Sequence, residues 1–228
     1  MSRKIFTAVC STVVISLLVT ACGAGGSGGG GPSATHSHAT PTTPALNGFP
    51  APVIPISNPL SDEKIALGRQ LFYDIRLSGN GTQSCASCHH QDKAFTDGKP
   101  LAIGSTGEIH PRNSQGLANV VYNATLTWAN PALTELERQM EVPMFGDNPV
   151  EMGINDGNKA EVLNRFKMDL AIVNRFKTAF PKDVDSISFT NIIAAIASFQ
   201  RTLISNESKW GRAEIRIKNV HNTKSNKI

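Results

Sequence analysis

The sequence predicts a mainly α-helical fold, and three observations carry that prediction. Apolar residues recur at helical spacing from Leu163 to Phe180 and again from Ser188 to Ser205. A serine followed by two acids, Ser61-Asp62-Glu63, opens an earlier apolar repeat of the same kind. No stretch shows the alternation of apolar and polar residues that is typical of a strand. With 228 residues, the chain has room for one domain of ordinary size.

Residues 1–21 have the pattern of an export signal. Arg3 and Lys4 precede an apolar run, Ile5 to Val19, that is too short to span a membrane as a mature helix. The run leads into Val19-Thr20-Ala21-Cys22, which resembles a bacterial lipobox. That resemblance implies cleavage before Cys22, lipidation of Cys22, and a periplasmic protein anchored to a bacterial membrane by its lipid. An ordinary signal peptide or an uncleaved anchor is the alternative, and each version predicts export.

Residues 22–58 predict a flexible linker. The segment is first Gly/Ser-rich and then Pro/Thr-rich, and it has no periodic apolar pattern. We therefore expect the folded domain to begin near residue 59.

Ser61 predicts the start of a helix, because serine caps helix N-termini and the acids that follow complement the helix dipole. Ile65, Gly68 and Phe72 fall on one face of this helix. Glycine inside a helix costs about 1 kcal/mol relative to alanine. Its place on the apolar face predicts that another backbone approaches closely there. Gly79-Asn80-Gly81 then turns the chain into the next motif.

The run Cys85-Ala86-Ser87-Cys88-His89 has the C-x-x-C-H spacing of covalent attachment to a c-type haem. The spacing lets both thiols reach the two vinyl groups of one porphyrin and brings His89 under the iron as an axial ligand. A zinc half-site or a redox dithiol shares the C-x-x-C part. Zinc would need two more ligands at related spacing, and the chain has no second pair. Residues 59–205 are therefore predicted to form a cytochrome c-like helical haem domain.

Proline and apolar spacing define the remaining predicted helices. Proline is tolerated in the first turn of a helix and stops one elsewhere. The predicted ranges are Pro131 to Met140, ended by Pro143; two helices within Leu163–Phe180 that meet near Asp169 and stop at Pro181; and Ser188 to Ser205.

Residues 206–228 are polar and basic and predict a loosely ordered tail. This tail and the cations of the signal account for the formal net charge of +4, so nothing predicts a nucleic-acid surface. Cys10 leaves with the signal and Cys22 carries lipid, so no disulfide is expected.

Several motifs in order, from about Asn58 to Ser205, resemble the bacterial di-haem cytochrome c peroxidase family, which includes the MauG-type enzymes. They are Leu67-Gly68-Arg69-Gln70-Leu71-Phe72-Tyr73-Asp74, Arg76-Leu77-Ser78, Gly79-Asn80-Gly81-Thr82, Ser84-Cys85-Ala86-Ser87-Cys88-His89, Phe95-Thr96-Asp97-Gly98, Arg112-Asn113-Ser114 and Leu136-Glu137-Arg138-Gln139. The matched part corresponds to the N-terminal, peroxide-reactive haem domain. The resemblance implies an oxidoreductase that reduces hydrogen peroxide with electrons from a periplasmic donor or substrate protein.

Two further stretches are similar to one branch of that family, the MbnH-like branch. They are Trp128-Ala129-Asn130-Pro131 and the segment from Pro143-Met144-Phe145-Gly146 through Met152-Gly153. Members of this branch pair with a small copper-associated protein and oxidise a tryptophan on it.

The resemblance also implies catalytic roles. Glu137 matches the distal carboxylate that moves a proton between the peroxide oxygens. Without the family context, a solvated glutamate on a short helix is the simpler interpretation. Trp128 matches a tryptophan that passes electrons between the two haems, and plain core packing is an equal alternative. Gln139 and Pro143 match positions near the same pocket.

Two more residues are candidate ligands by the same resemblance. Asn113 matches a residue at the calcium site between the two haem domains of the family. His110 is a candidate distal iron ligand, although it sits only two residues before Arg112, closer than the usual ligand. A free loop histidine is equally plausible.

The sequence departs from the family at its C-terminal end. Relatives carry a second C-x-x-C-H, this sequence has none, and we expect the likeness to end at Ser205. The departure predicts a truncated or frameshifted chain with one haem and slow peroxidase turnover. Two alternatives stay open. One is a single-haem electron carrier with His110, Met140, Met144 or Met152 as sixth ligand; the other is a nonfunctional remnant.

Overall fold

The computed structural model describes residues 49–206, 208–209 and 212–213, which belong to the second of two compact units of the chain, residues 38–228. Within these residues there are helices and three isolated bridges but no strand, which confirms the predicted mainly α fold. The predicted signal, Cys22 and most of the linker lie outside the described residues. No helix in the described ranges is long and apolar enough to cross a membrane.

Six α-helices and three short 3-10 turns make up the described part of the chain. The α-helices are α1 (Asp62–Phe72), α2 (Cys85–Cys88), α3 (Leu136–Phe145), α4 (Lys159–Lys167), α5 (Leu170–Ala179) and α6 (Phe189–Gln200). The 3-10 turns are η1 (Ile75–Leu77), η2 (Gln91–Lys93) and η3 (Val120–Tyr122).

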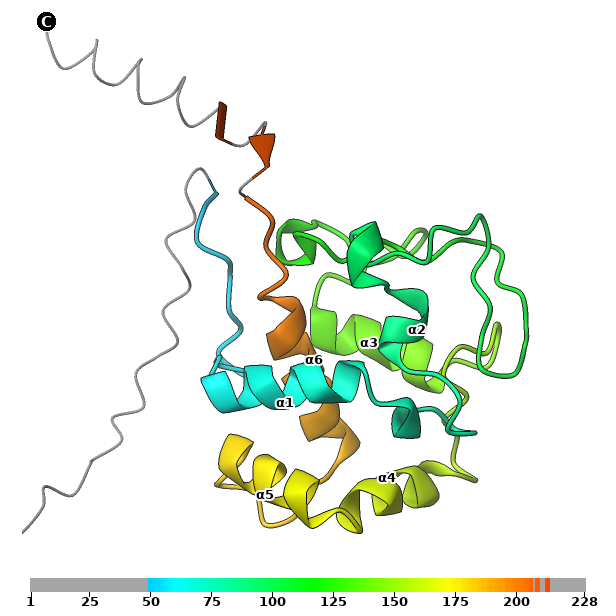
Figure 1. The fold of residues 1–228 in the computed structure, drawn as a ribbon, viewed down its shortest axis with the longest axis vertical. Coiled ribbons are helices and arrows are strands. Elements are labelled where there is room, and N and C mark those ends of the chain that lie inside the picture. Colours follow the sequence, from blue (N-terminus) through cyan, green and yellow to red (C-terminus); the bar gives the residue numbers. More distant parts are fainter. Residues whose placement is uncertain (1–48, 207, 210–211, 214–228) are drawn as a thin grey trace, which may run out of the picture. The chain divides into compact units, whose positions relative to one another are not determined.

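Helix α6 is the central element, because both α1 and α3 pack against it (Figure 1). Most residues of α6 are buried, because one face of the helix is apolar and several of its other residues are small. The core around it is built from side chains that are almost completely buried: Leu67, Leu71, Phe72, Phe166, Phe176, Ile192 and Ile196. Cys85 and Ala86 of α2 pack against this core, so the core holds the C-x-x-C-H loop in place.

Helix α1 begins where the sequence predicts. The Ser61 hydroxyl accepts a hydrogen bond from the Lys64 amide at 3.2 Å and caps the helix. A Cβ atom on Gly68 would lie 1.9 Å from the carbonyl oxygen of Ala195 in α6. The predicted close backbone approach at Gly68 is therefore confirmed, and it is the crossing of α1 and α6.

The two helices predicted within Leu163–Phe180 are also confirmed. Helix α4 ends at Lys167, and the Asp169 carboxylate caps α5 by accepting hydrogen bonds from the amides of Ala171 (3.0 Å) and Ile172 (3.3 Å). Helix α5 stops at Ala179, before Pro181. Aspartate at the junction satisfies amides that the start of α5 would otherwise leave without partners.

Helix α3 differs from its prediction at both ends. It runs from Leu136 to Phe145 instead of Pro131 to Met140, and Pro143 lies inside it. Residues before Leu136 form a turn in which the Leu126 amide bonds to the Leu133 carbonyl at 2.9 Å. Pro143 cannot donate a hydrogen bond to the carbonyl four residues earlier, and its ring crowds that carbonyl. The helix continues because the following loop donates to its last carbonyls, with Met152 bonded to Pro143 at 2.9 Å.

Helix α6 ends at Gln200, five residues before the predicted end at Ser205. The chain then follows the loop before η3: the Asn119 amide donates to the Leu203 carbonyl, and the Ser205 amide donates to the Asn119 side chain, both at 2.7 Å. Most of the predicted tail lies outside the described residues. Where the tail is described, the Arg212 amide donates to the Ser208 carbonyl at 3.0 Å.

Candidate haem site

A cavity opens beside α2 and α3, and the C-x-x-C-H motif forms part of its wall. Cys85, Cys88 and His89 all line it. The rest of its lining is largely apolar and includes Leu117, Val120, Leu136, Met140, Met144 and Met152. A mostly apolar cleft with a few polar groups is the usual setting for a large cofactor. The structure thus places both sulfurs and the candidate axial nitrogen on one side of a cleft that suits a porphyrin.

The two thiols are not activated by their surroundings. Burial raises the pKa of Cys85 to about 12, and burial likewise raises the pKa of Cys88. Redox dithiols and thiolate metal ligands need a lowered pKa. Among the residues that the structure describes, no group of three or more His, Cys, Asp and Glu side chains could hold a metal ion together. Uncharged thioethers to a porphyrin are the chemistry that this apolar setting fits.

His89 is held for iron binding by a hydrogen bond on its other nitrogen. Its Nδ1 lies 2.7 Å from the carbonyl oxygen of Phe95, which assigns the ring proton to Nδ1. Burial lowers the pKa of His89, and the nearby carbonyls of Phe95 and Gln115 oppose that shift. A neutral ring with Nδ1 protonated leaves Nε2 as the nitrogen that can coordinate a metal.

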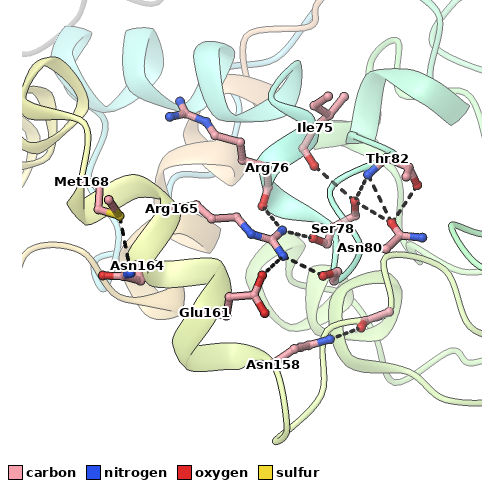
Figure 2. A network of polar contacts seen from close by, with 12 residues as sticks. Ile75, Arg76, Ser78, Asn80, Thr82, Asn158, Glu161, Asn164, Arg165 and Met168 are labelled. Atoms are coloured by element: carbon pink, nitrogen blue, oxygen red, sulfur yellow. Dashed lines mark hydrogen bonds and ion pairs between the residues drawn. The ribbon is translucent and has the colours of Figure 1, made fainter.

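The turn that leads into α2 is fixed by Arg165 of α4 (Figure 2). Its guanidinium donates to the carbonyl oxygens of Arg76 (3.2 Å), Ser78 (2.8 Å) and Gly79 (2.9 Å) and also pairs with Glu161. These carbonyls lie at the end of η1 and in the turn that follows it, where the backbone polar groups need such a partner. Arg165 therefore positions the segment that carries the cysteines.

Glu137, the predicted proton-transfer residue, does not line the cavity. Both its carboxylate oxygens accept hydrogen bonds from Arg201 at 2.7 Å, and Asn58 donates to Oε1 at 2.7 Å. Burial acts to raise the pKa of Glu137, but the hydrogen bonds from Arg201 and Asn58 outweigh it and hold the pKa below its ordinary value. Because Arg201 pairs with both oxygens, the structure places Glu137 in an ion pair outside the cavity lining, and its role in proton transfer stays a prediction.

The carboxylate on the cavity is Glu151, which the sequence analysis did not single out. Glu151 is the only Asp or Glu among the described residues that lines the cavity. Burial raises its pKa, and the nearby His110 opposes that shift. A sequence signal for it exists: Glu151 is a lone acid between the apolar residues Val150 and Met152, two residues after Pro149.

His110 also lines the cavity and is buried, with 8% of its surface exposed. Its Nε2 lies 3.2 Å from the carbonyl oxygen of Val150, and its Nδ1 lies 4.0 Å from the Glu151 carboxylate. His110 therefore sits in contact with the segment that carries Glu151, and its role as a distal iron ligand stays a prediction.

The structure brings Trp128 and Asn113 together at the cavity. Both line it, and the Trp128 indole nitrogen donates to the Asn113 backbone carbonyl at 3.1 Å. The Trp128 side chain is half exposed, so it is not a core residue. Gln139 and Pro143 line the same cavity, as the resemblance implied.

Gln200, at the end of α6, is a second cavity residue that the sequence analysis missed. It is buried, and its Oε1 has no hydrogen-bond partner within the described part of the chain. A buried amide oxygen without a partner is costly. Because Gln200 lines the cavity, a bound group with a polar substituent would satisfy it, which again fits a haem. No local sequence pattern distinguishes this glutamine.

A helical domain whose C-x-x-C-H loop opens onto an apolar cleft, with a neutral histidine on the loop, is a c-type haem domain by architecture. The comparisons with known proteins agree and are more specific. The family model for di-haem cytochrome c peroxidase matches residues 62–218, which extends past Ser205. The chain belongs to the di-haem cytochrome c peroxidase family, and membership of that family implies haem c as the cofactor.

Individual relatives confirm this placement. The chain is 53% identical to a solved MauG-like protein associated with microbial copper homeostasis, with a TM-score of 0.71 over 72% of this chain and 47% of that one. It is 38% identical over 179 residues to the cytochrome-c peroxidase IdrP1 of Pseudomonas sp. (strain SCT), covering 78% of this chain and 44% of the relative. It is 34% identical over 158 residues to the methylamine utilization protein MauG of Methylorubrum extorquens, covering 69% and 43%. The chain spans less than half the length of each relative.

Proposed function

We propose that this chain is the peroxide-reactive haem domain of a periplasmic peroxidase-type oxidoreductase. It holds one haem c through Cys85 and Cys88, with His89 as axial ligand, and reduces hydrogen peroxide with electrons from a protein donor or substrate. The observation that carries the proposal is one cavity that is lined both by the C-x-x-C-H motif and, among the described residues, by a single carboxylate, Glu151. Membership of a peroxidase family supports the same chemistry.

The haem, when bound, supplies the iron that binds peroxide and delivers electrons to its O–O bond. Glu151 takes the proton from one peroxide oxygen and returns it to the other, so that the departing oxygen leaves as water. Its raised pKa suits this task, because the carboxyl can hold the proton and release it again. His110 lies 4.0 Å from Glu151 and acts as a positioning residue for it.

The electron source is a protein, and we propose a small copper-associated protein whose tryptophan is oxidised. The 53% identity to a MauG-like protein associated with microbial copper homeostasis supports this assignment. Trp128 is the proposed relay for these electrons, since it is exposed on one side and lines the cavity on the other. We also propose that Asn113 contributes to a calcium site, as the family resemblance implies.

Export and lipid attachment at Cys22 complete the proposed setting. A covalent c-type haem is attached outside the cytoplasm, which suits an exported chain, and a lipid anchor would hold the domain near the membrane. Replacing Cys22 with serine should move the protein from the membrane fraction to the soluble periplasmic fraction. Retention of the C22S variant in the membrane would contradict the lipid anchor.

A second candidate function is a single-haem electron carrier. Met140, Met144 and Met152 are buried and line the cavity, so a thioether could complete the iron coordination. Absorption spectra distinguish the two functions. A low-spin ferric spectrum that peroxide does not change supports the carrier, and a high-spin spectrum that peroxide changes supports the enzyme.

The decisive experiment compares Glu151→Gln with Glu137→Gln in haem-loaded protein. Stopped-flow absorption would follow the first reaction with hydrogen peroxide. We expect E151Q to slow that step by about 10²–10⁴-fold, the usual contribution of a positioned acid–base group. E137Q should keep the native rate per folded, haem-loaded molecule. A native rate in E151Q, or a loss confined to E137Q, would contradict the assignment of Glu151.

A further inference from the structure

The ring of His89 is connected to the protein surface by a short series of aromatic contacts. The Phe72 ring lies 6.4 Å from the His89 ring, centroid to centroid, and 5.3 Å from the Tyr73 ring. Phe95 and Phe199 pack edge-on against Phe72 at 6.1 and 5.3 Å and hold it in place. Edge-to-face geometry at these separations is a favourable packing arrangement for aromatic side chains.

Phe72, in the middle of this series, and Tyr73, at its outer end, differ in chemistry and in exposure. Phe72 is fully buried, whereas Tyr73 exposes 43% of its surface. The Tyr73 hydroxyl donates to the side-chain oxygen of Gln91 at 3.3 Å, at an exposed position. Phenylalanine is hard to oxidise, so Phe72 does not itself hold the radical. It lies between His89 and Tyr73 and provides a packed path for electron transfer between them. Tyrosine is readily oxidised when its hydroxyl proton can leave, and solvent at the exposed hydroxyl can accept that proton.

The series runs away from the peroxide side of the site. Neither Phe72 nor Tyr73 lines the cavity, whereas Trp128 and Glu151 do. Packing alone explains why Phe72 is buried, because it sits in the core of α1 and α6. Packing does not require that the residue after it, at the C-cap of α1, be an exposed phenol.

We propose that Tyr73 is a surface redox site that releases oxidising equivalents from the haem on the His89 side. This inference rests on the proposed peroxidase function, whose reaction with peroxide supplies the oxidant. Tyr73 gives one electron to the oxidised haem by way of Phe72 and His89, and its hydroxyl proton passes to water. The products are a neutral tyrosyl radical and a haem reduced by one electron. A reductant or a radical trap in solution then reacts with the exposed ring.

The experiment uses the haem-loaded chain, hydrogen peroxide and the trap 2-methyl-2-nitrosopropane. The nitroso nitrogen bonds to the radical ring, which yields a nitroxide that gives an electron paramagnetic resonance signal and adds mass to one peptide. We expect the adduct on the peptide that contains Tyr73. Tyr73→Phe should reduce the adduct to the level of a peroxide-free sample, and Phe72→Leu should lower its yield while Tyr73 is still present.

The chain provides a matched control, because it contains only two tyrosines. The other one, Tyr122, has its ring 5.2 Å from Phe49 and donates to the Pro50 carbonyl at 3.0 Å. Tyr122→Phe should leave the adduct unchanged. An adduct that persists in Y73F, or one that disappears in Y122F, would overturn the proposal.

The same samples separate this inference from the proposed function. The haem absorption spectrum shows whether peroxide has oxidised the haem. If the spectrum changes and no adduct forms at Tyr73, the inference about Tyr73 is wrong and the peroxidase function stands. If the spectrum does not change, the peroxidase function fails, and the Tyr73 proposal fails with it because its oxidant is missing.

Discussion

Glu137 and Glu151 are two carboxylates of one domain in opposite surroundings. Arg201 and Asn58 bind the first and lower its pKa, whereas burial beside an apolar cavity raises the pKa of the second. A carboxylate that accepts hydrogen bonds from Arg201 on both oxygens is stabilised in its charged form and takes up a proton less readily. When the surroundings shift the pKa values of two carboxyl groups in opposite directions, the difference often marks which group does the chemistry. The surroundings therefore favour the proposal that Glu151 transfers the proton and that Glu137 stabilises the fold.

The raised pKa of Glu151 predicts the pH dependence of the first peroxide step. Only the deprotonated carboxylate can take the proton from peroxide, so the rate should rise with pH around a midpoint above the ordinary glutamate value of about 4.3. His110 holds that midpoint down, so His110→Gln should move it to higher pH. Stopped-flow rates across the acid and neutral range would measure both midpoints. A midpoint in H110Q at or below the native one would contradict the pairing.

Glu137→Gln should destabilise the domain. Arg201 is only 4% exposed, so the substitution leaves a buried cation without its partner, at a cost of about 3–5 kcal/mol in unfolding free energy. The pKa of Glu137 is lowered in the folded chain, so its contribution is present above the unfolded pKa and is lost as pH falls through the folded one. Urea unfolding at neutral and acid pH would therefore show a difference between native and variant that shrinks in acid.

Glu141→Gln provides the control, because Glu141 is an exposed residue of the same helix. It should change stability by less than about 0.5 kcal/mol. Equal losses in E137Q and E141Q would mean that the pair with Arg201 contributes little.

The sequence predicts the roles of some site residues well and of others poorly. The spacing of Cys85, Cys88 and His89 alone indicates a covalent haem, because the chemistry fixes their separation along the chain. Glu137 and Glu151 could not be ranked in this way. Which of two glutamates reaches the cavity depends on where Arg201 and Asn58 lie, and these residues are 64 and 79 positions away from Glu137.

At the scale of helices, sequence patterns predict the fold well where an element carries its own signals. Ser61, Asp169 and Ser188 cap the helices that they were predicted to begin. The prediction failed for α3, where Pro143 lies inside the helix. Its last carbonyls find partners in the loop that contains Met152, and that partnership depends on tertiary contacts.

Gly68→Ala should separate α1 from α6. The added methyl group would lie 1.9 Å from the Ala195 carbonyl, so the helices must move apart, and overpacking of this kind costs about 1–3 kcal/mol. Thermal unfolding would measure the loss. Gln70→Ala, an exposed change in the same helix, should leave stability within about 0.5 kcal/mol. A G68A variant as stable as Q70A would contradict the close crossing.

Arg165→Met should loosen the turn that leads into the haem motif. The variant loses the donors to the carbonyls of Arg76, Ser78 and Gly79, and we expect a loss of about 2 kcal/mol together with poorer haem attachment. Unfolding curves and the haem-to-protein absorbance ratio would measure the two effects.

The matched control for Arg165 is Glu161→Gln, which removes only the ion pair on the outer side of the guanidinium. The Glu161 side chain is 69% exposed, so its loss should cost less than about 0.5 kcal/mol. If R165M loads haem and unfolds like E161Q, the bonds to the turn do not position the motif.

At the scale of the whole molecule, the chain covers less than half the length of its relatives, and its sequence holds one C-x-x-C-H motif. Reduction of peroxide takes two electrons, and these must reach the haem cavity from a donor. The first reaction with peroxide depends only on the cavity, whereas repeated turnover also depends on electron delivery.

We therefore predict that the first reaction with peroxide is faster than steady-state turnover, because only turnover depends on electron delivery from a donor. Stopped-flow absorption would measure the first, and peroxide consumption with a reduced cytochrome or copper protein as donor would measure the second. Steady-state turnover as fast as the first reaction would show that electron delivery does not limit the rate.

Asn58 lies at the end of the predicted linker and attaches that end firmly to the helices of the domain. It is buried, and its side-chain amide donates to Glu137 of α3 and to both Ala194 and Ser198 of α6. A pulling force on the preceding chain would act first on these hydrogen bonds to α3 and α6, which share the load. The first turn of α1 would be loaded only after they break. A domain tethered at this end would thus resist a pulling force without distortion of its porphyrin cleft.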